Sequence, residues 1–279
     1  MKYIIAGILI VVAITASAQR LPLKARSSKA LSGSAFARSI SDTTLSIDDR
    51  EKQIFREIRS GNVPEFYRQL VRVTDTADIN GDIHTIEYFV LPDFLAIGSD
   101  TDYFYCPMRP ALAQKIANLL DCSLPTRKMS DQIHKLAPVK LIPLPIPPTK
   151  SMITVPVFIR HNGMVWEQRK GNLAEYPAGT LSAGNKKDVV ISNKIYTPDN
   201  RSHVVIYGWH HPDGKAIQPL YNGHDADWAD YSHGIRLIQE SVLVDGRKTR
   251  LRKILRSPEL HVLVSDEGII ARPEYPLRY

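Results

Sequence analysis

The spacing of apolar residues predicts helices mainly in the first half of the chain. Ser46, followed three residues later by Asp49, is typical of a capped helix start, and apolar residues at helical spacing continue until Gly61. After Pro110 the apolar residues recur at i, i+4 and i+7, which predicts a second helix, and Thr126 can cap a third. We expect these two later helices to form a helical hairpin.

Strand patterns lie between the first predicted helix and the second. Segments 69–76 and 82–91 are rich in Val, Ile, Thr and aromatic residues, and Asn80-Gly81 between them has the backbone freedom that a tight hairpin turn requires. The apolar segments 94–97 and 103–105 follow, separated by a polar turn. We expect them to extend the sheet that the hairpin begins.

A proline-rich segment, 138–149, precedes the second half of the chain. Its five prolines predict an extended, polyproline-like connector that can separate two lobes. Residues 153–169 can form a helix, and strands are predicted at 189–191, 204–207, 235–244 and 260–264. These patterns predict a single α+β domain over 46–279, with helices mainly in the N-terminal half and a mostly antiparallel sheet in the C-terminal half.

The N-terminus has the features of a secretory signal peptide. Lys2 gives a positive start, an apolar run follows, and Ala16-Ser17-Ala18 fits the small-x-small pattern that precedes cleavage. Residues 1–18 are therefore predicted to be removed, with a retained N-terminal anchor as the alternative. The apolar run is shorter than the ~20 residues that span a bilayer, and no later stretch qualifies. We expect a secreted or periplasmic protein with no transmembrane segment after cleavage.

The net charge of +7 is concentrated near the start of the mature chain. Lys2 leaves with the signal peptide, and residues 19–41 carry five cations and no acid, so residues 42–279 keep about one positive charge. We therefore predict a disordered, basic, Ser/Ala-rich linker at 19–45 and no nucleic-acid partner. A second basic cluster is consistent either with solvated surface or with contact to an anionic polymer. Its members are Arg247, Lys248, Arg250, Arg252, Lys253 and Arg256.

Composition limits the class of protein. With 43% hydrophobic residues the chain can bury a real core, which excludes disordered, collagen-like and disulfide-dense small proteins. Cys106 and Cys122 can form one disulfide in an oxidising compartment or remain as two buried thiols. The sequence leaves both outcomes open, and it leaves the oligomeric state open as well.

Candidate reactive side chains concentrate between residues 203 and 236. Five of the nine histidines lie within 31 residues there, beside loops at predicted strand ends, where functional side chains are often exposed. We predict that His210 and His233 act as acid and base. Ser232 or Tyr231 would serve as nucleophile or proton relay, and Arg236 would hold a substrate carboxylate or an oxyanion. The residues expected to bind the substrate are Lys187, Asp188, Tyr207, Trp209 and Gln218.

A zinc site is a second way to use these groups. Imidazoles and carboxylates together suit zinc, and an open coordination position would activate water. The candidate ligands are His210, His211, His224, Asp225, Asp227 and His233. Residues 211–218 resemble the His-x-x-Gly-x-Ala-x-Asp element of zinc D,D-carboxypeptidases, but Gln218 stands where that family has a metal-binding Asp. We therefore expect an enzyme without a cofactor, with a zinc-dependent hydrolase as an alternative.

Residues 232–237, Ser-His-Gly-Ile-Arg-Leu, are similar to the Ser-His-Gly-Cys-Ile-Arg element of L,D-transpeptidases. His210 lies upstream, in roughly the place of that family's other histidine. The nucleophilic Cys of the family is absent from this element, so the thiol mechanism cannot operate here. What the resemblance implies is a cell-wall peptide as the substrate.

Together these observations predict an exported enzyme of the hydrolase class. Its substrate would be a cell-envelope polymer such as peptidoglycan, or an extracellular polysaccharide or peptide polymer. The alternative is a non-catalytic envelope- or carbohydrate-binding protein whose aromatic side chains stack on sugars. Those side chains would be Trp209, Tyr221, Trp228 and Tyr231. Catalysis requires the predicted imidazoles, hydroxyl and guanidinium to share one pocket, so their placement in the fold distinguishes the two functions.

Overall fold

The computed structural model describes residues 19–198 and 201–277, so the predicted signal peptide at 1–18 lies outside the described residues. Within the described ranges, no helix is long and apolar enough to cross a membrane. The α-helices there are α1 (Gly33–Ser39), α2 (Ile47–Arg59), α3 (Pro110–Leu119), α4 (Arg127–Leu136), α5 (Val155–Asn172) and α6 (Leu251–Leu255). Short 3-10 helices are η1 (Glu65–Arg68), η2 (Lys150–Ile153) and η3 (Leu260–Leu263).

The larger sheet takes its strands from both halves of the chain. Its members are β1 (Val71–Ile79), β2 (Asp82–Val90), β5 (Cys122–Ser123), β12 (Ile238–Gln239), β13 (Ser241–Val244) and β14 (Arg247–Arg250). They run in the order β14-β13-β2-β12-β5, with β1 along the other side of β2, and all the pairs are antiparallel. The predicted mixture of helices and mainly antiparallel sheet is confirmed. Helices and sheet are nevertheless interleaved along the chain.

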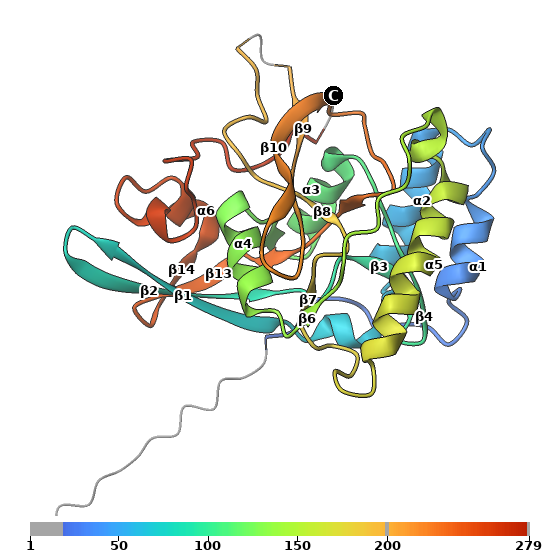
Figure 1. Cartoon of the computed structure of the whole chain (residues 1–279), viewed down its shortest axis with the longest axis horizontal. Coiled ribbons are helices and arrows are strands. Elements are labelled where there is room, and N and C mark those ends of the chain that lie inside the picture. The colour runs from blue at the N-terminus through green and yellow to red at the C-terminus, as the bar shows by residue number, and fades with distance from the viewer. Residues whose placement is uncertain (1–18, 199–200, 278–279) are drawn as a thin grey trace, which may run out of the picture.

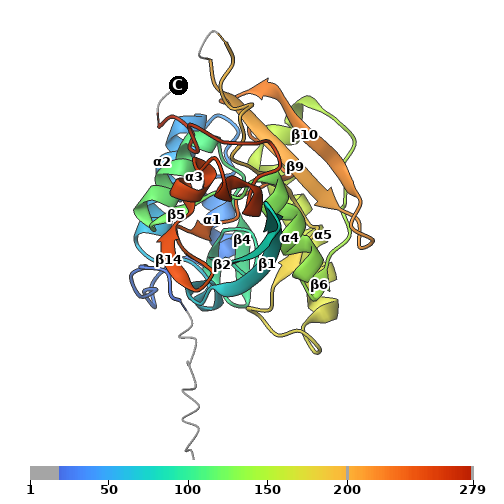
Figure 2. The ribbon, with the colours of Figure 1, turned by 90° about the vertical axis from the view of Figure 1, so that its left-hand side faces the viewer.

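A second sheet of four strands carries most of the predicted site residues. Its strands are β8 (Lys187–Val189), β9 (His203–His210), β10 (Ala216–Asp225) and β11 (His233–Gly234). The order is β10-β9-β8-β11, in which only the β8–β11 pair is parallel. Helix α4 contacts β9 of this sheet and β1 of the larger one, and it lies between them in Figure 2. Side chains of α4 therefore face β9.

The local capping and turn signals of the sequence are confirmed. The Ser46 hydroxyl accepts a hydrogen bond from the Asp49 amide at the start of α2, and Thr126 caps α4 in the same way. Asn80 and Gly81, with φ of 59° and 96°, form the turn between β1 and β2. These features were predictable because each depends on a few neighbouring residues.

Two predicted strand assignments are wrong. Segments 94–97 and 103–105 form a separate hairpin, β3 (Ala96–Ser99) with β4 (Asp102–Tyr105), which packs against α1 and does not extend the larger sheet. The segment 260–264 forms η3. Its helical turn is favoured because the Ser257 hydroxyl accepts a hydrogen bond from the Leu260 amide.

The proline-rich connector, residues 138–149, is fastened to the body of the protein near its start. Val139–Lys140 forms strand β6, which pairs in parallel with β7 (Ser182–Ala183). From Leu141 to Thr149 the connector has no helix or strand, as its prolines predict. The helix expected after it is confirmed as α5.

The two cysteines are buried free thiols, so the disulfide that the sequence left open is not formed. The Cys106 thiol donates to the carbonyl of Phe104, and the Cys122 thiol donates to that of Leu120. Burial raises the pKa of both thiols well above its ordinary value. Neither group is therefore suited to act as a thiolate.

Residues 19–45 are ordered, contrary to the linker predicted for them. Leu21, Phe36 and Ile40 are buried in the core, the last two from α1 and its C-cap. The Arg26 guanidinium donates to the Asn62 side chain and to the carbonyl of Gly98. The charge pattern suggested disorder, but a few apolar residues at helical spacing are enough to anchor the segment. Figure 1 shows α1 beside α5 at one end of the molecule.

Replacing Gly33 tests whether this segment belongs to the folded body. A Cβ at residue 33 would collide with the backbone of Tyr103, so we expect Gly33→Ala to lower the free energy of unfolding by about 1–3 kcal/mol. Gly163→Ala, in open space on α5, is the matched control and should be neutral or slightly stabilising. Urea unfolding measures both. Equal stability of the two variants would show that α1 does not pack on β4.

Candidate functional site

The main candidate site is a surface depression of about 390 Å³ between α4 and the end of β9. We call it the His210 depression. It is lined by Asp131, His134, Lys135, Lys140, Tyr207, His210, Asp213 and Gly214. Helix α4 and the β9–β10 hairpin supply most of these side chains, so the depression lies where two separate parts of the fold meet.

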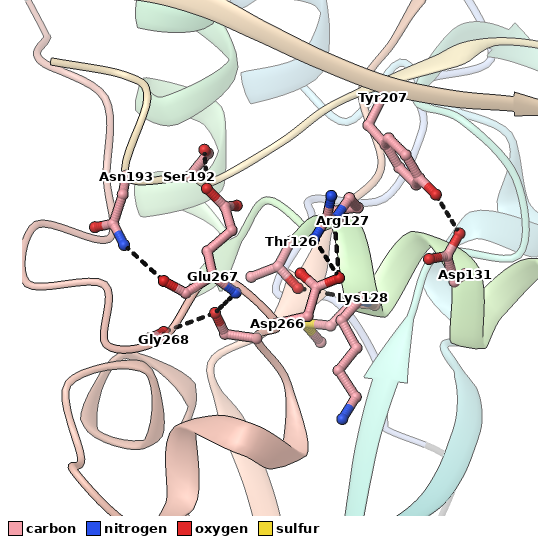
Figure 3. Close-up of polar contacts among 12 residues, drawn as sticks. Thr126, Arg127, Lys128, Asp131, Ser192, Asn193, Tyr207, Asp266, Glu267 and Gly268 are labelled. Atoms are coloured by element: carbon pink, nitrogen blue, oxygen red, sulfur yellow. Dashed lines mark hydrogen bonds and ion pairs between the residues drawn. The ribbon is translucent and has the colours of Figure 1, made fainter. Parts of the chain in front are cut away.

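Asp131 accepts hydrogen bonds from both strand residues at the centre of the depression. His210 Nε2 lies 2.8 Å from Asp131 Oδ1, and the Tyr207 hydroxyl donates to the same oxygen at 2.9 Å. Figure 3 shows the second of these contacts, with Asp131 projecting from α4 toward Tyr207. The His134 ring stacks on the His210 ring at 4.6 Å between centroids. The His210 side chain is nearly covered, whereas that of Asp131 remains 47% exposed.

An unusual backbone conformation brings Tyr207 and His210 to the same carboxylate. Strict alternation along a strand would place residues 207 and 210 on opposite faces. Gly208 and Trp209 between them have φ of 95° and 54°, which turns the strand and returns His210 to the face of Tyr207. A positive φ at tryptophan is costly, and such strain often accompanies functional sites. The strained backbone at Trp209 thus brings the side chains of Tyr207 and His210 together in the depression.

Burial sets the protonation of several groups around the depression. It raises the pKa of Tyr207, with the Asp131 hydrogen bond adding to the effect, so the phenol keeps its proton. Burial and the neighbouring His210 lower the pKa of His134 to about 4, so this ring is neutral at pH 7. Burial also raises the pKa of Asp188 to about 6, against the opposing charges of Arg236 and His210. At pH 7 Tyr207 and His134 are therefore neutral, whereas Asp188 is mainly ionised and lies 3.9 Å from Arg236.

This arrangement can support acid–base chemistry. A carboxylate that is oriented by an imidazole N–H and a phenol can take a proton from water and return it to a leaving group. Lys135 and Lys140 line the depression beside the acids Asp131 and Asp213, so two ammonium groups stand where the carboxylate of a substrate could contact them. No cysteine or serine lines the depression, so the geometry favours an activated water over a covalent intermediate.

Other predicted site residues lie around a second, buried group near β11. The Ser232 hydroxyl donates to Asp230 Oδ1 at 2.6 Å, and His233 Nε2 lies 3.7 Å from Asp230 Oδ2. The Tyr231 hydroxyl exchanges hydrogen bonds with the backbone of Ile146. Ser232 and His233 are each only 1% exposed. Ser232 and Tyr231 therefore have hydrogen-bond partners of their own, whereas neither ring nitrogen of His233 has one among the described residues. None of the three lines the His210 depression.

Arg236 lies deeper still and is 1% exposed. Its guanidinium donates to the carbonyls of Leu91 and Ser182 and stands 3.9 Å from Asp188. It cannot bind a substrate carboxylate from that position. The prediction that one pocket would hold His210, Ser232, His233 and Arg236 is therefore wrong. Neighbouring strand residues project to opposite faces, so closeness in sequence did not become closeness in space.

The residues predicted to bind substrate are divided in the same way. Tyr207 lines the His210 depression, and the buried Asp188 lies beneath it near Arg236. Lys187 lies over the Trp209 ring at 5.1 Å on the other face. Gln218 is on β10, where its amide donates to the adjacent carbonyl of Pro219.

The aromatic side chains of the binding alternative do not form one shelf. Trp209 and Tyr231 are buried at 4% and 3% exposure, so they cannot stack on a sugar. Tyr221 is exposed, and Trp228 is half-buried with its indole against the His224 ring at 4.8 Å. Of the four, Tyr221 is exposed and Trp228 partly exposed, and both contact the His224 ring.

The zinc alternative lacks an assembled donor set in the described part of the chain. Across residues 19–198 and 201–277, no group of three or more His, Cys, Asp or Glu side chains is placed to hold a metal ion. His224 stacks on Trp228, while Asp225 and Asp227 are exposed. The placement of these side chains therefore does not fit a zinc site.

Sequence reasoning missed Asp131 and His134. Both lie one turn apart on the helix predicted after Thr126. In the sequence they look like ordinary polar residues on the exposed face of an amphipathic helix. Their spacing at i and i+3 places them on one face, which was a weak available signal. What the sequence did not show was that this face meets the end of β9.

Acid should destabilise the fold through its buried imidazoles. Burial, only partly opposed by Asp230, lowers the pKa of His233 to about 4. Between pH 6.5 and 4 the unfolded chain binds this proton and the folded chain does not, so stability falls as the pH falls. The shift corresponds to about 3 kcal/mol for this group. Urea unfolding at pH 7, 5.5 and 4.5 measures the slope.

The matched variant for this prediction is His233→Gln, which cannot titrate. Asp188 opposes the trend, because its raised pKa makes protonation favour the folded state between pH 6 and about 4. The comparison of wild type with His233→Gln removes this background. We expect a shallower dependence on pH in the variant, and identical slopes would contradict the assignment.

No family model, curated protein or solved structure matches this chain. The chemistry of the site itself is therefore the basis for assigning a function.

Proposed function

We propose that this protein is an exported hydrolase that cleaves an anionic polymer of the cell envelope or the extracellular space at the His210 depression. The observation that carries the proposal is the hydrogen-bonded group of Asp131, His210 and Tyr207 at an open surface. Positioned acid–base groups of this kind typically accelerate proton-transfer steps by about 10²–10⁴-fold. Export is supported by the signal-peptide pattern at 1–18.

The proposed reaction uses the three side chains in separate roles. Asp131 takes a proton from a water molecule as the water oxygen bonds to the scissile carbon, while the N–H of His210 donates the hydrogen bond that orients the Asp131 side chain. The bond to the leaving oxygen or nitrogen breaks, and Asp131 gives its proton to that atom. Tyr207 keeps its proton throughout and holds the carboxylate in place. Water is consumed, and each half of the polymer gains one part of it.

The class of substrate follows from the charges at the rim. Lys135 and Lys140 both line the depression and can contact the carboxylates of an acidic polysaccharide or of a cell-wall peptide. We therefore place peptidoglycan and uronic-acid polymers first among the substrates.

Tyr207→Phe tests the proposal directly. The phenyl ring preserves the packing but removes the hydrogen bond to Asp131, so turnover should fall about tenfold, as expected for a lost hydrogen bond to a charged group. The measurement is the release of soluble fragments from peptidoglycan and from polygalacturonate. Tyr221→Phe, at an exposed position on β10, is the control and should behave as wild type. Fragment release that is identical in all three proteins would contradict the role of Tyr207.

A further inference from the structure

A second depression of about 390 Å³ lies at the edge of the larger sheet, away from the His210 depression. We call it the basic groove. It is lined by Asp121, Ser241, Lys248, Thr249, Arg250 and Lys253. The turn after α3, the β13–β14 hairpin and α6 supply these residues. Figure 1 shows β13, β14 and α6 close together, on the side of the molecule opposite α1 and α5.

The groove carries more positive than negative charge. Its only lining acid, Asp121, lies 2.6 Å from Arg250 and is neutralised by it. Lys248 and Lys253 are exposed, and neither has an ion-pair or hydrogen-bond partner for its ammonium group in the described part of the chain. Two lysine charges therefore remain available to a ligand.

A buried acid next to the groove holds Arg250, one of its lining residues, in place. Glu240 is 1% exposed and lies 3.0 Å from the Arg252 guanidinium and 3.7 Å from that of Arg250. Arg252 also donates to the Asn118 side chain. Because these contacts fix Arg250 in advance, a ligand that binds it loses less conformational freedom on the protein side. The hydroxyls of Ser241 and Thr249 add hydrogen-bond donors at the same surface.

We propose that the basic groove binds a carboxylate-bearing polysaccharide, as a second contact for the polymer that is cleaved at the His210 depression. The identity of the polymer rests on the proposed function. Lysine and arginine meet carboxylates, while serine and threonine meet sugar hydroxyls. No aromatic side chain lines the groove, so bases of a single-stranded nucleic acid would have no surface on which to stack. The groove is open along the surface and can accept a section of a long chain.

The test is binding of fluorescently labelled polygalacturonate to the purified protein at low and at physiological salt. The double variant Lys248→Gln, Lys253→Gln should raise the Kd roughly three- to tenfold at low salt, because each exposed ion pair contributes modestly. Its Kd should also depend less on salt than that of wild type. The control is Lys150→Gln, Lys194→Gln, which removes the same charge from exposed lysines outside the groove and should change the Kd less than twofold.

Several results would overturn the proposal. Equal weakening of the two double variants would show that net charge alone governs binding. Tighter binding of polyphosphate or of double-stranded DNA than of polygalacturonate would show that the groove does not select carboxylates. Undetectable binding of polygalacturonate by the wild-type protein would contradict the proposed binding site. Since this assay does not require turnover, it separates the two proposals. A protein that binds through the groove but cleaves nothing would contradict only the proposed function.

Discussion

Replacing Asp131 with asparagine should lower polymer cleavage by about 10²–10⁴-fold, the usual contribution of a positioned acid–base group. The amide has the same shape and can still accept a hydrogen bond from Tyr207, but it cannot take a proton from water. Because the Asp131 side chain is 47% exposed, the substitution should leave the melting temperature almost unchanged. Initial rates of fragment release and thermal unfolding together measure the effect.

Asp213→Asn is the matched control for this experiment. Asp213 lines the same depression on the turn between β9 and β10 and accepts a hydrogen bond from the Lys215 amide. In the described part of the chain, no hydrogen bond links it to Tyr207 or His210. We expect its turnover to stay within a few-fold of wild type. Full activity of the Asp131 variant would contradict the proposal that the depression is the active site. Equal losses in both variants would indicate that charge at the rim matters and that general-base catalysis does not.

Replacing Arg236 with methionine should cost about 3–5 kcal/mol of stability, the range found when one partner of a buried ion pair is removed. Methionine can occupy the space over the Phe94 ring, where the guanidinium now lies 4.2 Å from the centroid. It cannot donate to the carbonyls of Leu91 and Ser182, and it leaves Asp188 without its cation. Urea unfolding at pH 7 measures the loss.

Arg256→Met is the control for this second prediction. Arg256 is exposed and makes one hydrogen bond from its side chain, to the carbonyl of Ala271. We expect a change below about 1 kcal/mol for such a surface position. A similar loss of stability in the two variants would mean that the buried contacts of Arg236 contribute little to the stability of the fold. A stable Arg236 variant that lost only substrate binding would instead support the role that the sequence suggested for it.

The local features of the fold could be read from the sequence because they depend on near neighbours. The caps at Ser46 and Thr126 and the Asn80-Gly81 turn each involve residues within a few positions of one another. The errors arose where contacts between residues far apart in the sequence decide the structure. Residues 94–97 and 103–105 were expected to extend the first hairpin's sheet, but residues 96–99 pair with 102–105 and this separate hairpin packs against α1.

The candidate site was only half predictable for the same reason. His210 and Tyr207 were recognised because they lie in a dense run of reactive residues. Asp131 comes from a helix about 80 positions earlier, and the contact between them depends on where α4 packs. The twist at Trp209 was also hidden, since a positive φ at tryptophan is contrary to its usual preference.

By itself, the sequence determined the helices α2 to α5, the caps of α2 and α4, the first hairpin, the mixed α+β class and the strand residues Tyr207 and His210 of the candidate site. The tertiary structure decided which of those side chains meet. It placed Ser232, His233 and Arg236 in the interior and joined His210 to Asp131 at the surface. The physical reason is that hydrophobic spacing and capping act over a few residues, whereas an active site is formed by the packing of elements far apart in the chain.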